Sequence, residues 1–336
     1  MLIQAVLRQI KQRVTNISSS STTKSLKTVA KQIHKKARFE KHPMYPERFP
    51  VPDDKVDWAV DFPEYRPDYF VAPTVLENDY TQKENGWADP EDITLLKRPL
   101  LSYEGEIKFN SKSRPLNPCG RTGIEGRGLL GGWGANLTVD SIVTSMNPET
   151  HEIEMLAILR DSGEWAIPGG FIDAEEPVLK ALERELKEET GIKLDMSSAI
   201  EIYCGYIDDP RNTDNAWIET IARHKHLDSG FAEKLILKAG GDAKAVKWLP
   251  LTEKDVDSLY SSHGELVRIA LAKFFEQVNP VRSSARAKGA SPKDPVPSPA
   301  ASYGTGLGEA TSNGVKESLL EVTEIPKGPE WIPELD

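Results

Sequence analysis

The sequence predicts an α/β protein, in which helices cover a mixed sheet and a smaller, mainly extended N-terminal region precedes them. Three observations lead to this prediction. Strand-like apolar runs alternate with two helical patterns after residue 133, a Pro- and Gly-rich stretch comes before them, and both chain ends differ from this body in composition. The 336 residues are enough for about two domains of ordinary size.

The overall composition excludes several classes of protein. The chain carries 42 Lys and Arg against 52 Asp and Glu, a formal charge of -10, and only two cysteines. Two cysteines without paired Cys/His spacing exclude a disulfide scaffold and a zinc module. No run approaches the roughly 18 apolar residues of a membrane-spanning helix, and an acidic body is a poor match for nucleic acid. We therefore expect neither a membrane nor nucleic acid as a partner.

Residues 1–39 form a basic N-terminal segment. They contain nine Lys or Arg and no acidic residue, and the apolar residues from Leu2 to Ile17 lie on one arc of a helix. A Ser/Thr-rich run follows, from Ser18 to Ser25. This combination predicts a mitochondrial transit peptide. The alternative is a solvated basic arm on a cytoplasmic protein.

Residues 44–132 differ from the rest of the body in composition and in hydrophobic periodicity. Proline and aromatic residues are frequent and no helical period is sustained, which predicts extended and turn structure in an N-terminal domain. The Gly-dense stretch from Asn117 to Leu137 allows positive φ angles and the approach of main-chain N–H groups to an anion. A plain interdomain loop is the alternative.

Residues 133–278 carry the patterns of a mixed α/β domain. We expect five strands and two helices, with turns at the Gly-Gly pairs 169–170 and 240–241; the strands are Thr138–Ser145, Glu154–Arg160, Ile200–Ile207, Ala216–Ala222 and Ala245–Leu249, and the helices are Glu176–Glu189 and Ser262–Gln277. Residues 279–336 are too poor in large apolar side chains to offset the entropy of ordering, so we predict a disordered tail.

The segment from Gly170 to Ile192 carries the chemistry. Pro177 suits the first turn of a helix and Gly191 suits its C-terminal cap, so a helix is expected over about 176–190. Three carboxylates, Glu185, Glu188 and Glu189, follow at i, i+3 and i+4 and therefore share one face. Carboxylates this close repel one another unless a cation lies among them, and hard oxygen ligands favour Mg²⁺ or Mn²⁺.

An ordinary helix with a solvated acidic face is the alternative for the local Arg-Glu-x-x-Glu-Glu pattern alone. The glycines at both ends and Glu176 in register favour a site. Arg184 is expected to orient a carboxylate by a charge-assisted hydrogen bond rather than to contact substrate. Glu188 or Glu189 could act as the general base, a role worth about 10²–10⁴ in rate.

The same segment resembles the Nudix box, since Gly170, Glu176 and the run from Arg184 to Ile192 fill every fixed position of that motif. The resemblance to the Nudix hydrolase family implies an α/β/α sandwich and metal-assisted cleavage of a nucleoside diphosphate derivative. Some family members take the general base from a separate loop, so the identity of the base stays open.

Three further segments, 48–73, 117–134 and 203–220, resemble the mitochondrial ADP-ribose pyrophosphatase subfamily and the ADP-ribose-binding domain of a melastatin-type channel. This resemblance implies hydrolysis of ADP-ribose to AMP and ribose 5-phosphate in a cleft between the N-terminal and Nudix domains. It also implies that six residues contact the substrate, namely Gly169, Phe171, Asp209, Arg211, Tyr260 and His263.

Two alternatives to this function remain at the level of sequence. The protein could bind ADP-ribose without cleaving it, as channel domains that have lost the glutamates do, or it could cleave another nucleoside diphosphate derivative. The presence of Glu185, Glu188 and Glu189 favours an enzyme. Relatives often have His in a GPNH segment where this chain reads Gly134-Ala135-Asn136-Leu137, so one polar substrate contact is expected to be missing.

Overall fold

The computed structural model describes residues 33–278, which belong to the first of two compact units, Met1–Ala287. The second unit, Lys288–Asp336, lies outside the described residues, as do the predicted tail and most of the predicted transit peptide. No helix within residues 33–278 has the length and apolar character needed to cross a membrane.

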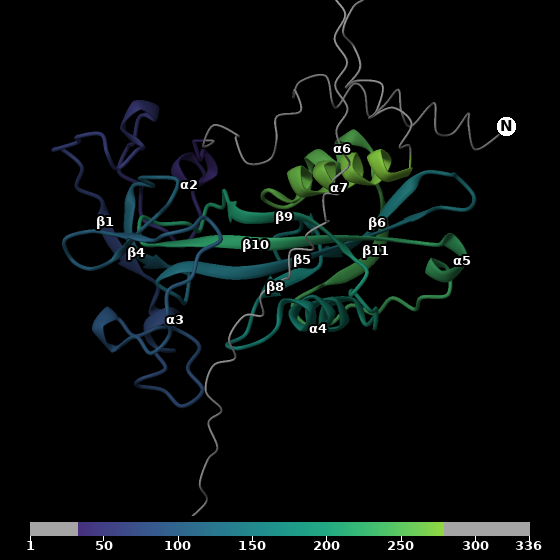
Figure 1. Cartoon of the computed structure of the whole chain (residues 1–336), viewed down its shortest axis with the longest axis horizontal. Helices are drawn as coiled ribbons and strands as arrows, with labels where there is room; N and C mark the ends of the chain where they lie inside the picture. Colours follow the sequence, from purple (N-terminus) through teal and green to yellow (C-terminus); the bar gives the residue numbers. More distant parts are fainter. Residues whose placement is uncertain (1–32, 279–336) are drawn as a thin grey trace, which may run out of the picture. The chain divides into compact units, whose positions relative to one another are not determined.

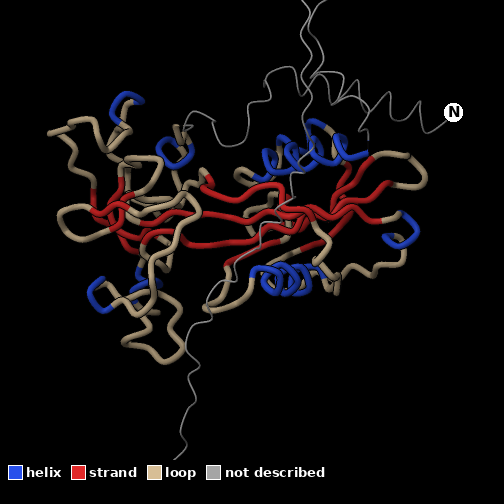
Figure 2. The backbone as a smooth tube through the Cα atoms, in the orientation of Figure 1, coloured by secondary structure: helices blue, strands red, loops and turns tan. Residues whose placement is uncertain are grey.

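The N-terminal part is built mainly from loops and short elements (Figure 2). Strand β1 pairs in parallel with β4, and β2 pairs with β3 in antiparallel fashion. The elements in chain order are α2 (Lys36–Phe39), η1 (Asp53–Lys55), β1 (Asp68–Val71), α3 (Pro73–Leu76), η2 (Ile93–Leu95), β2 (Lys108–Phe109), β3 (Pro115–Leu116) and β4 (Ile124–Gly128).

A mixed seven-stranded sheet forms the centre of the remaining part, with the path β11-β6-β5-β10-β9 and the short strands β7 and β8 attached to β6 and β5. Strands β5 and β10 pair in parallel over twelve residues, and the other pairs are antiparallel. The strands are β5 (Gly134–Met146), β6 (Ile153–Leu159), β7 (Trp165–Ala166), β8 (Gly169–Phe171), β9 (Ile200–Ile207), β10 (Ala216–Leu227) and β11 (Ala245–Pro250).

Helices cover both faces of this sheet, which confirms the predicted α/β class. Figure 1 shows α4 (Val178–Thr190) on one side and α6 (Glu253–Asp257) with α7 (His263–Val278) on the other. The short helix α5 (Ser229–Ala232) follows β10. Each face of the sheet has its own hydrophobic core, and side chains of β5 enter both of them. Val139 and Val143 pack with Leu186 of α4, whereas Ile142 packs with Val267 of α7.

The bounds of helix α4 agree with those of the predicted helix except at its start. It begins at Val178, with Pro177 as N-cap in an extended conformation, and not at residue 176. Gly191 ends it with φ 75°, and its N–H bonds the carbonyl of Lys187, as a left-handed cap does. The turn predicted at Gly169–Gly170 is wrong, because both residues lie in β8 and pair with β5.

The Gly-dense stretch is packed protein and not an open anion cradle. A Cβ at Gly126 would lie 2.4 Å from the carbonyl oxygen of Phe70, so the close approach of two backbones requires glycine there. The N–H groups of Gly123, Gly126 and Gly132 already donate to Tyr65, Asn215 and Asn136. Burial and backbone contact therefore explain the glycines without a phosphate.

Candidate active site

Strand β8 and helix α4 bring the predicted carboxylates together. The N–H of Gly169 donates to Oε2 of Glu189 at 2.8 Å, which joins the strand to the last turn of the helix. A Cβ at Gly170 would lie 2.4 Å from Oε1 of Glu185, so only glycine lets that carboxylate approach the strand. The two glycines thus set the distance between backbone and carboxylates.

Arg184 fixes the geometry of this face through its fork of donors. Its Nε and Nη2 bond the two carboxylate oxygens of Glu176 at 2.8 and 2.7 Å, and its Nη1 bonds Oε1 of Glu185 at 2.7 Å. Nη2 also donates to the carbonyl of Phe171 at 3.0 Å, while Glu188 is a looser partner at 3.5 Å. The predicted orienting role of Arg184 agrees with these contacts.

The three box carboxylates differ in environment. Glu189 is 3% exposed, and burial, opposed by the Gly169 N–H and assisted by the charges of Asp242 and Glu185, raises its pKa to about 9. Burial also raises the pKa of Glu185, although the Arg184 guanidinium opposes the change. The Glu188 side chain is 53% exposed and faces solvent. Negative charge on the inner two carboxylates is therefore incompletely balanced by the protein.

Asp242 is a further carboxylate at this site that the sequence analysis did not identify. The loop before β11 packs on the end of α4, with Gly240 N donating to the Glu189 carbonyl at 3.3 Å. A Cβ at Gly240 would lie 2.6 Å from the Glu188 carbonyl oxygen, so glycine is needed for this approach. The Gly240–Gly241 pair is the signal for this contact in the sequence, although by itself it predicts only a turn.

This donor set fits a divalent cation. Within residues 33–278, no three acidic, histidine or cysteine side chains already form a complete metal-binding group. A Mg²⁺ site does not need one, because this ion is usually held by one or two carboxylates, waters and substrate phosphates. The buried Glu189, beside two other carboxylates and bonded to a backbone N–H, lacks the positive partner that a cation would supply.

Asp209 and Arg211 form a second cluster, in the loop after β9. Arg211 binds both oxygens of Asp209, at 2.8 and 3.0 Å, and the Asp209 side chain is only 2% exposed. Ser261 also donates to Asp209, at 3.3 Å, which ties this loop to the segment before α7. Asp209 is thus fully engaged within the protein and orients Arg211, whose side chain is 23% exposed.

Tyr260 and His263 lie between the two clusters. Their rings meet edge to face, and the guanidinium of Arg160 lies 4.6 Å from the Tyr260 ring centre. His263 accepts a hydrogen bond from the Ile167 N–H at Nδ1, and burial lowers its pKa, so the neutral ring carries its proton at Nε2. This Nε2 is 3.8 Å from Oδ1 of Asp140.

Asp140 of β5 connects the two clusters. The sequence alone did not predict it as a site residue. Its Oδ2 accepts from Thr220, and its Oδ1 lies 3.1 Å from the Cβ position at Gly169. Contacts therefore run from Glu189 through Gly169 and Asp140 to His263. The only signal in the sequence was one carboxylate inside a strand-like run. Of the predicted substrate residues, Phe171 has the most exposed side chain, at 44% for the residue.

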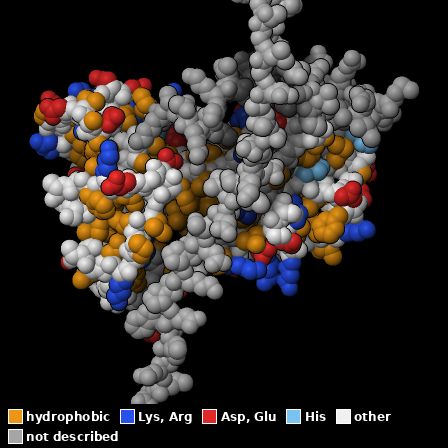
Figure 3. All heavy atoms as spheres, in the orientation of Figure 1, with side chains coloured by type: hydrophobic (Ala, Val, Ile, Leu, Met, Phe, Trp, Pro, Cys, Tyr) orange, Lys and Arg blue, Asp and Glu red, His pale blue; other side chains and the backbone are white. Residues whose placement is uncertain are grey.

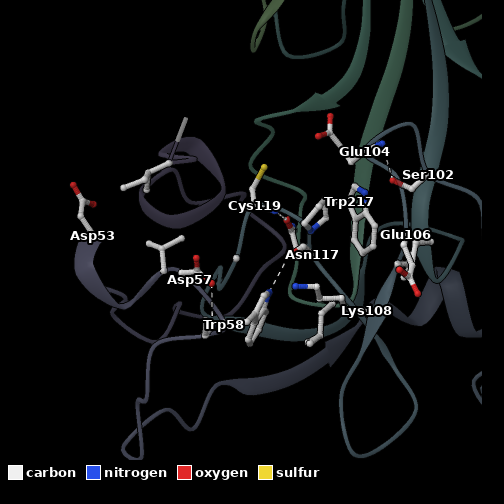
Figure 4. Close-up of a pocket in the computed structure, with 17 residues that line it drawn as sticks. Asp53, Asp57, Trp58, Ser102, Glu104, Glu106, Lys108, Asn117, Cys119 and Trp217 are labelled. Carbon is white, nitrogen blue, oxygen red and sulfur yellow. Dashed lines mark hydrogen bonds between the residues drawn. The ribbon is translucent and has the colours of Figure 1, made fainter. Parts of the chain in front are cut away.

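A cavity among the described residues lies elsewhere, between the N-terminal part and the start of β10 (Figure 4). It has a volume of about 620 Å³, and Trp58, Cys119 and Trp217 are among its lining residues. None of the predicted site residues lines it. We place the candidate active site at the carboxylates and not in this cavity, because only the former combine oxygen ligands with an arginine.

Comparison with known proteins identifies the family. The profile "NUDT9-like, N-terminal domain" matches residues 51–134 and the NUDIX domain profile matches residues 138–268. A protein of Caenorhabditis elegans named "Putative nudix hydrolase 6" is 40% identical over 242 residues, which cover 66% of this chain and 88% of that protein. The chain belongs to the Nudix hydrolase family. Its Nudix box runs from Gly170 to Ile192, across β8 and α4.

Two other relatives of this Nudix protein carry names that mention a ligand or an assembly. The mitochondrial ADP-ribose pyrophosphatase of Rattus norvegicus is 37% identical over 281 residues, which cover 71% of this chain and 78% of that one. A "Transient receptor potential cation channel subfamily M member-like 2" of Nematostella vectensis is 38% identical over 273 residues, 69% of this chain but 17% of the channel.

Proposed function

We propose that this Nudix protein hydrolyses the diphosphate of ADP-ribose to AMP and ribose 5-phosphate with Mg²⁺ or Mn²⁺. The observation that carries the proposal is the complete set of box carboxylates, held by Arg184 and Gly169 and connected through Asp140 to His263. Buried carboxylates whose charge is incompletely balanced by the protein are typical of catalytic and metal-binding sites.

Glu185, Glu188 and Glu189 would hold the metal, with Arg184 fixing the first of them. A bound divalent cation neutralises charge on the diphosphate and lowers the pKa of a water. The exposed Glu188 and the loop residue Asp242 are the candidates for accepting the proton, since both belong to this face and neither is tied to a backbone donor as Glu189 is.

The choice of ADP-ribose rests on the second cluster and on the relatives. Arg211 bonds Asp209 through Nε and Nη2, which leaves its Nη1 donors for a phosphate or the vicinal hydroxyls of a ligand. The rat relative is named for ADP-ribose, and it is similar to this chain across both domains.

Glutamine substitutions in the box test the chemistry. Glu188→Gln and Glu189→Gln should each lower AMP release from ADP-ribose by about 100-fold or more, because a neutral amide is a poor ligand for Mg²⁺ and accepts no proton. Glu183→Gln is the matched control, since Glu183 lies on the same helix and pairs with Lys180 instead. Near-normal turnover in both box variants would contradict the proposed metal site.

We also propose that the N-terminal residues direct the protein to mitochondria. The basic, acid-free composition of residues 1–32 supports this, as does the name of the rat relative. A reporter fused behind residues 1–39 should colocalise with a mitochondrial marker, and a diffuse cytosolic signal would contradict the proposal.

A further inference from the structure

The end of the basic N-terminal segment is part of the folded protein. His34, Ala37 and Arg38 are 2%, 0% and 6% exposed, values typical of a core and not of a solvated arm. The His34 ring bonds the Tyr206 hydroxyl and the Arg121 carbonyl, each at 2.9 Å. Arg38 donates to the carbonyls of His34 and Val51. Residues 34–38 are therefore anchored at both ends.

A single carboxylate, Asp208, connects this segment to the loop after β9. Its oxygens accept the N–H groups of Lys35 at 2.6 Å and of Lys36 and Ala37 at 2.9 Å each. These are the free donors at the start of α2, so a residue more than 170 positions away caps the helix. Charge-assisted bonds of this kind are among the stronger hydrogen bonds in proteins.

Asp208 is also next to the second cluster in the chain. It directly precedes Asp209, the partner of Arg211, and its carbonyl accepts a hydrogen bond from Ser262 at 2.9 Å. Ser262 lies between Tyr260 and His263 in the chain, and Nζ of Lys36 reaches its hydroxyl at 3.4 Å. The N-terminal segment thus contacts residues beside two of the three stretches that carry the predicted substrate residues, 209–211 and 260–263.

We propose that residues 34–38, clamped by Asp208, position the substrate-binding loop, and that any removal of the basic N-terminus ends before His34. Asp208 is then a positioning residue, which acts through Asp209 and Arg211; this role rests on the proposed function of the site. If the loop is already ordered before binding, none of the binding free energy of the substrate is used to order it. The clamp is therefore expected to lower KM more than it raises kcat.

The test compares variants of the full chain. Asp208→Ala removes all three acceptor contacts, and Asp208→Asn leaves one neutral oxygen. Lys35→Ala is the matched control, because the exposed Lys35 side chain changes while its backbone N–H remains. We expect Asp208→Ala to raise KM for ADP-ribose about tenfold or more with kcat within about threefold, Asp208→Asn to lie between it and the wild type, and Lys35→Ala to match the wild type.

Amide hydrogen exchange provides a readout that does not depend on activity. Exchange at residues 35–37 and 209–212 should be faster in Asp208→Asn than in Lys35→Ala, since the clamp holds both segments. If the wild type fails to cleave ADP-ribose, the proposed function is wrong while this exchange still tests the clamp. Unchanged KM and unchanged exchange in Asp208→Asn, in an enzyme that does cleave ADP-ribose, would overturn the inference.

Removal of the segment gives a second test. N-terminal sequencing of protein recovered from mitochondria should place the first residue at or before 34. A mature form that begins at residue 40 and retains the wild-type KM would overturn the inference, because it would lack α2 altogether.

Discussion

Replacement of Arg184 by alanine should lower catalysis through the loss of its bond to Glu185. The substitution removes the 2.7 Å bond to Glu185, the two bonds to Glu176 and the bond to the Phe171 carbonyl. Hydrogen bonds to charged groups contribute about 1.5–3 kcal/mol each, and the 26% exposure of the Arg184 side chain places these near the lower limit. The bond that positions a metal ligand is the one to Glu185.

We therefore expect Arg184→Ala to lose about 2–3 kcal/mol of transition-state stabilisation, or about 30- to 150-fold in kcat/KM. Arg184→Lys keeps the charge but not the fork and should lose about tenfold. Initial rates of AMP release at several Mg²⁺ concentrations measure both effects, and circular dichroism confirms the fold. A folded Arg184→Ala variant with rates within threefold of the wild type at every Mg²⁺ concentration would refute the orienting role.

Two other predictions concern the loop carboxylate Asp242 and the pH dependence of stability. Asp242→Asn removes the loop carboxylate beside Glu189 and should lower kcat at least tenfold with KM for ADP-ribose unchanged; equal kcat in steady-state assays would exclude a catalytic role for this loop. Burial lowers the pKa of His224 to about 4 from its usual 6.5, so the unfolded chain binds the proton first and stability falls as the pH decreases through this window. The free energy of unfolding, measured with urea, should be about 2–3 kcal/mol lower at pH 4.5 than at pH 7.5, and His224→Gln should lack this loss. Parallel pH profiles of the two proteins would contradict the prediction.

Much of the fold could be predicted because its signals are local. Strand β9 has the predicted limits, and α4 ends at the glycine that its cap requires, since periodicity and capping depend on neighbours in sequence. Strand β8 could not be predicted, because a Gly-Gly pair is typical of a turn. Its pairing with β5 follows from a close packing of backbones that no local pattern encodes.

The candidate site could likewise be predicted only where its signals are local in the sequence. The spacing of Glu185, Glu188 and Glu189 places them on one face of a helix, so the sequence alone indicated a metal site. Asp242 and Asp208 act through contacts with distant segments, which only the folded chain brings together. The buried contacts of residues 34–38 belong to this second class, within a segment whose composition predicts a transit peptide.

The most direct test of the proposed function is a product assay on the purified protein. Incubation with ADP-ribose, NADH or a nucleotide sugar, each with and without Mg²⁺, should release AMP and ribose 5-phosphate from ADP-ribose alone and only with the metal. Saturable binding of ADP-ribose with no AMP under any metal condition would contradict catalysis. Equal cleavage of all three nucleotides would contradict the assigned substrate.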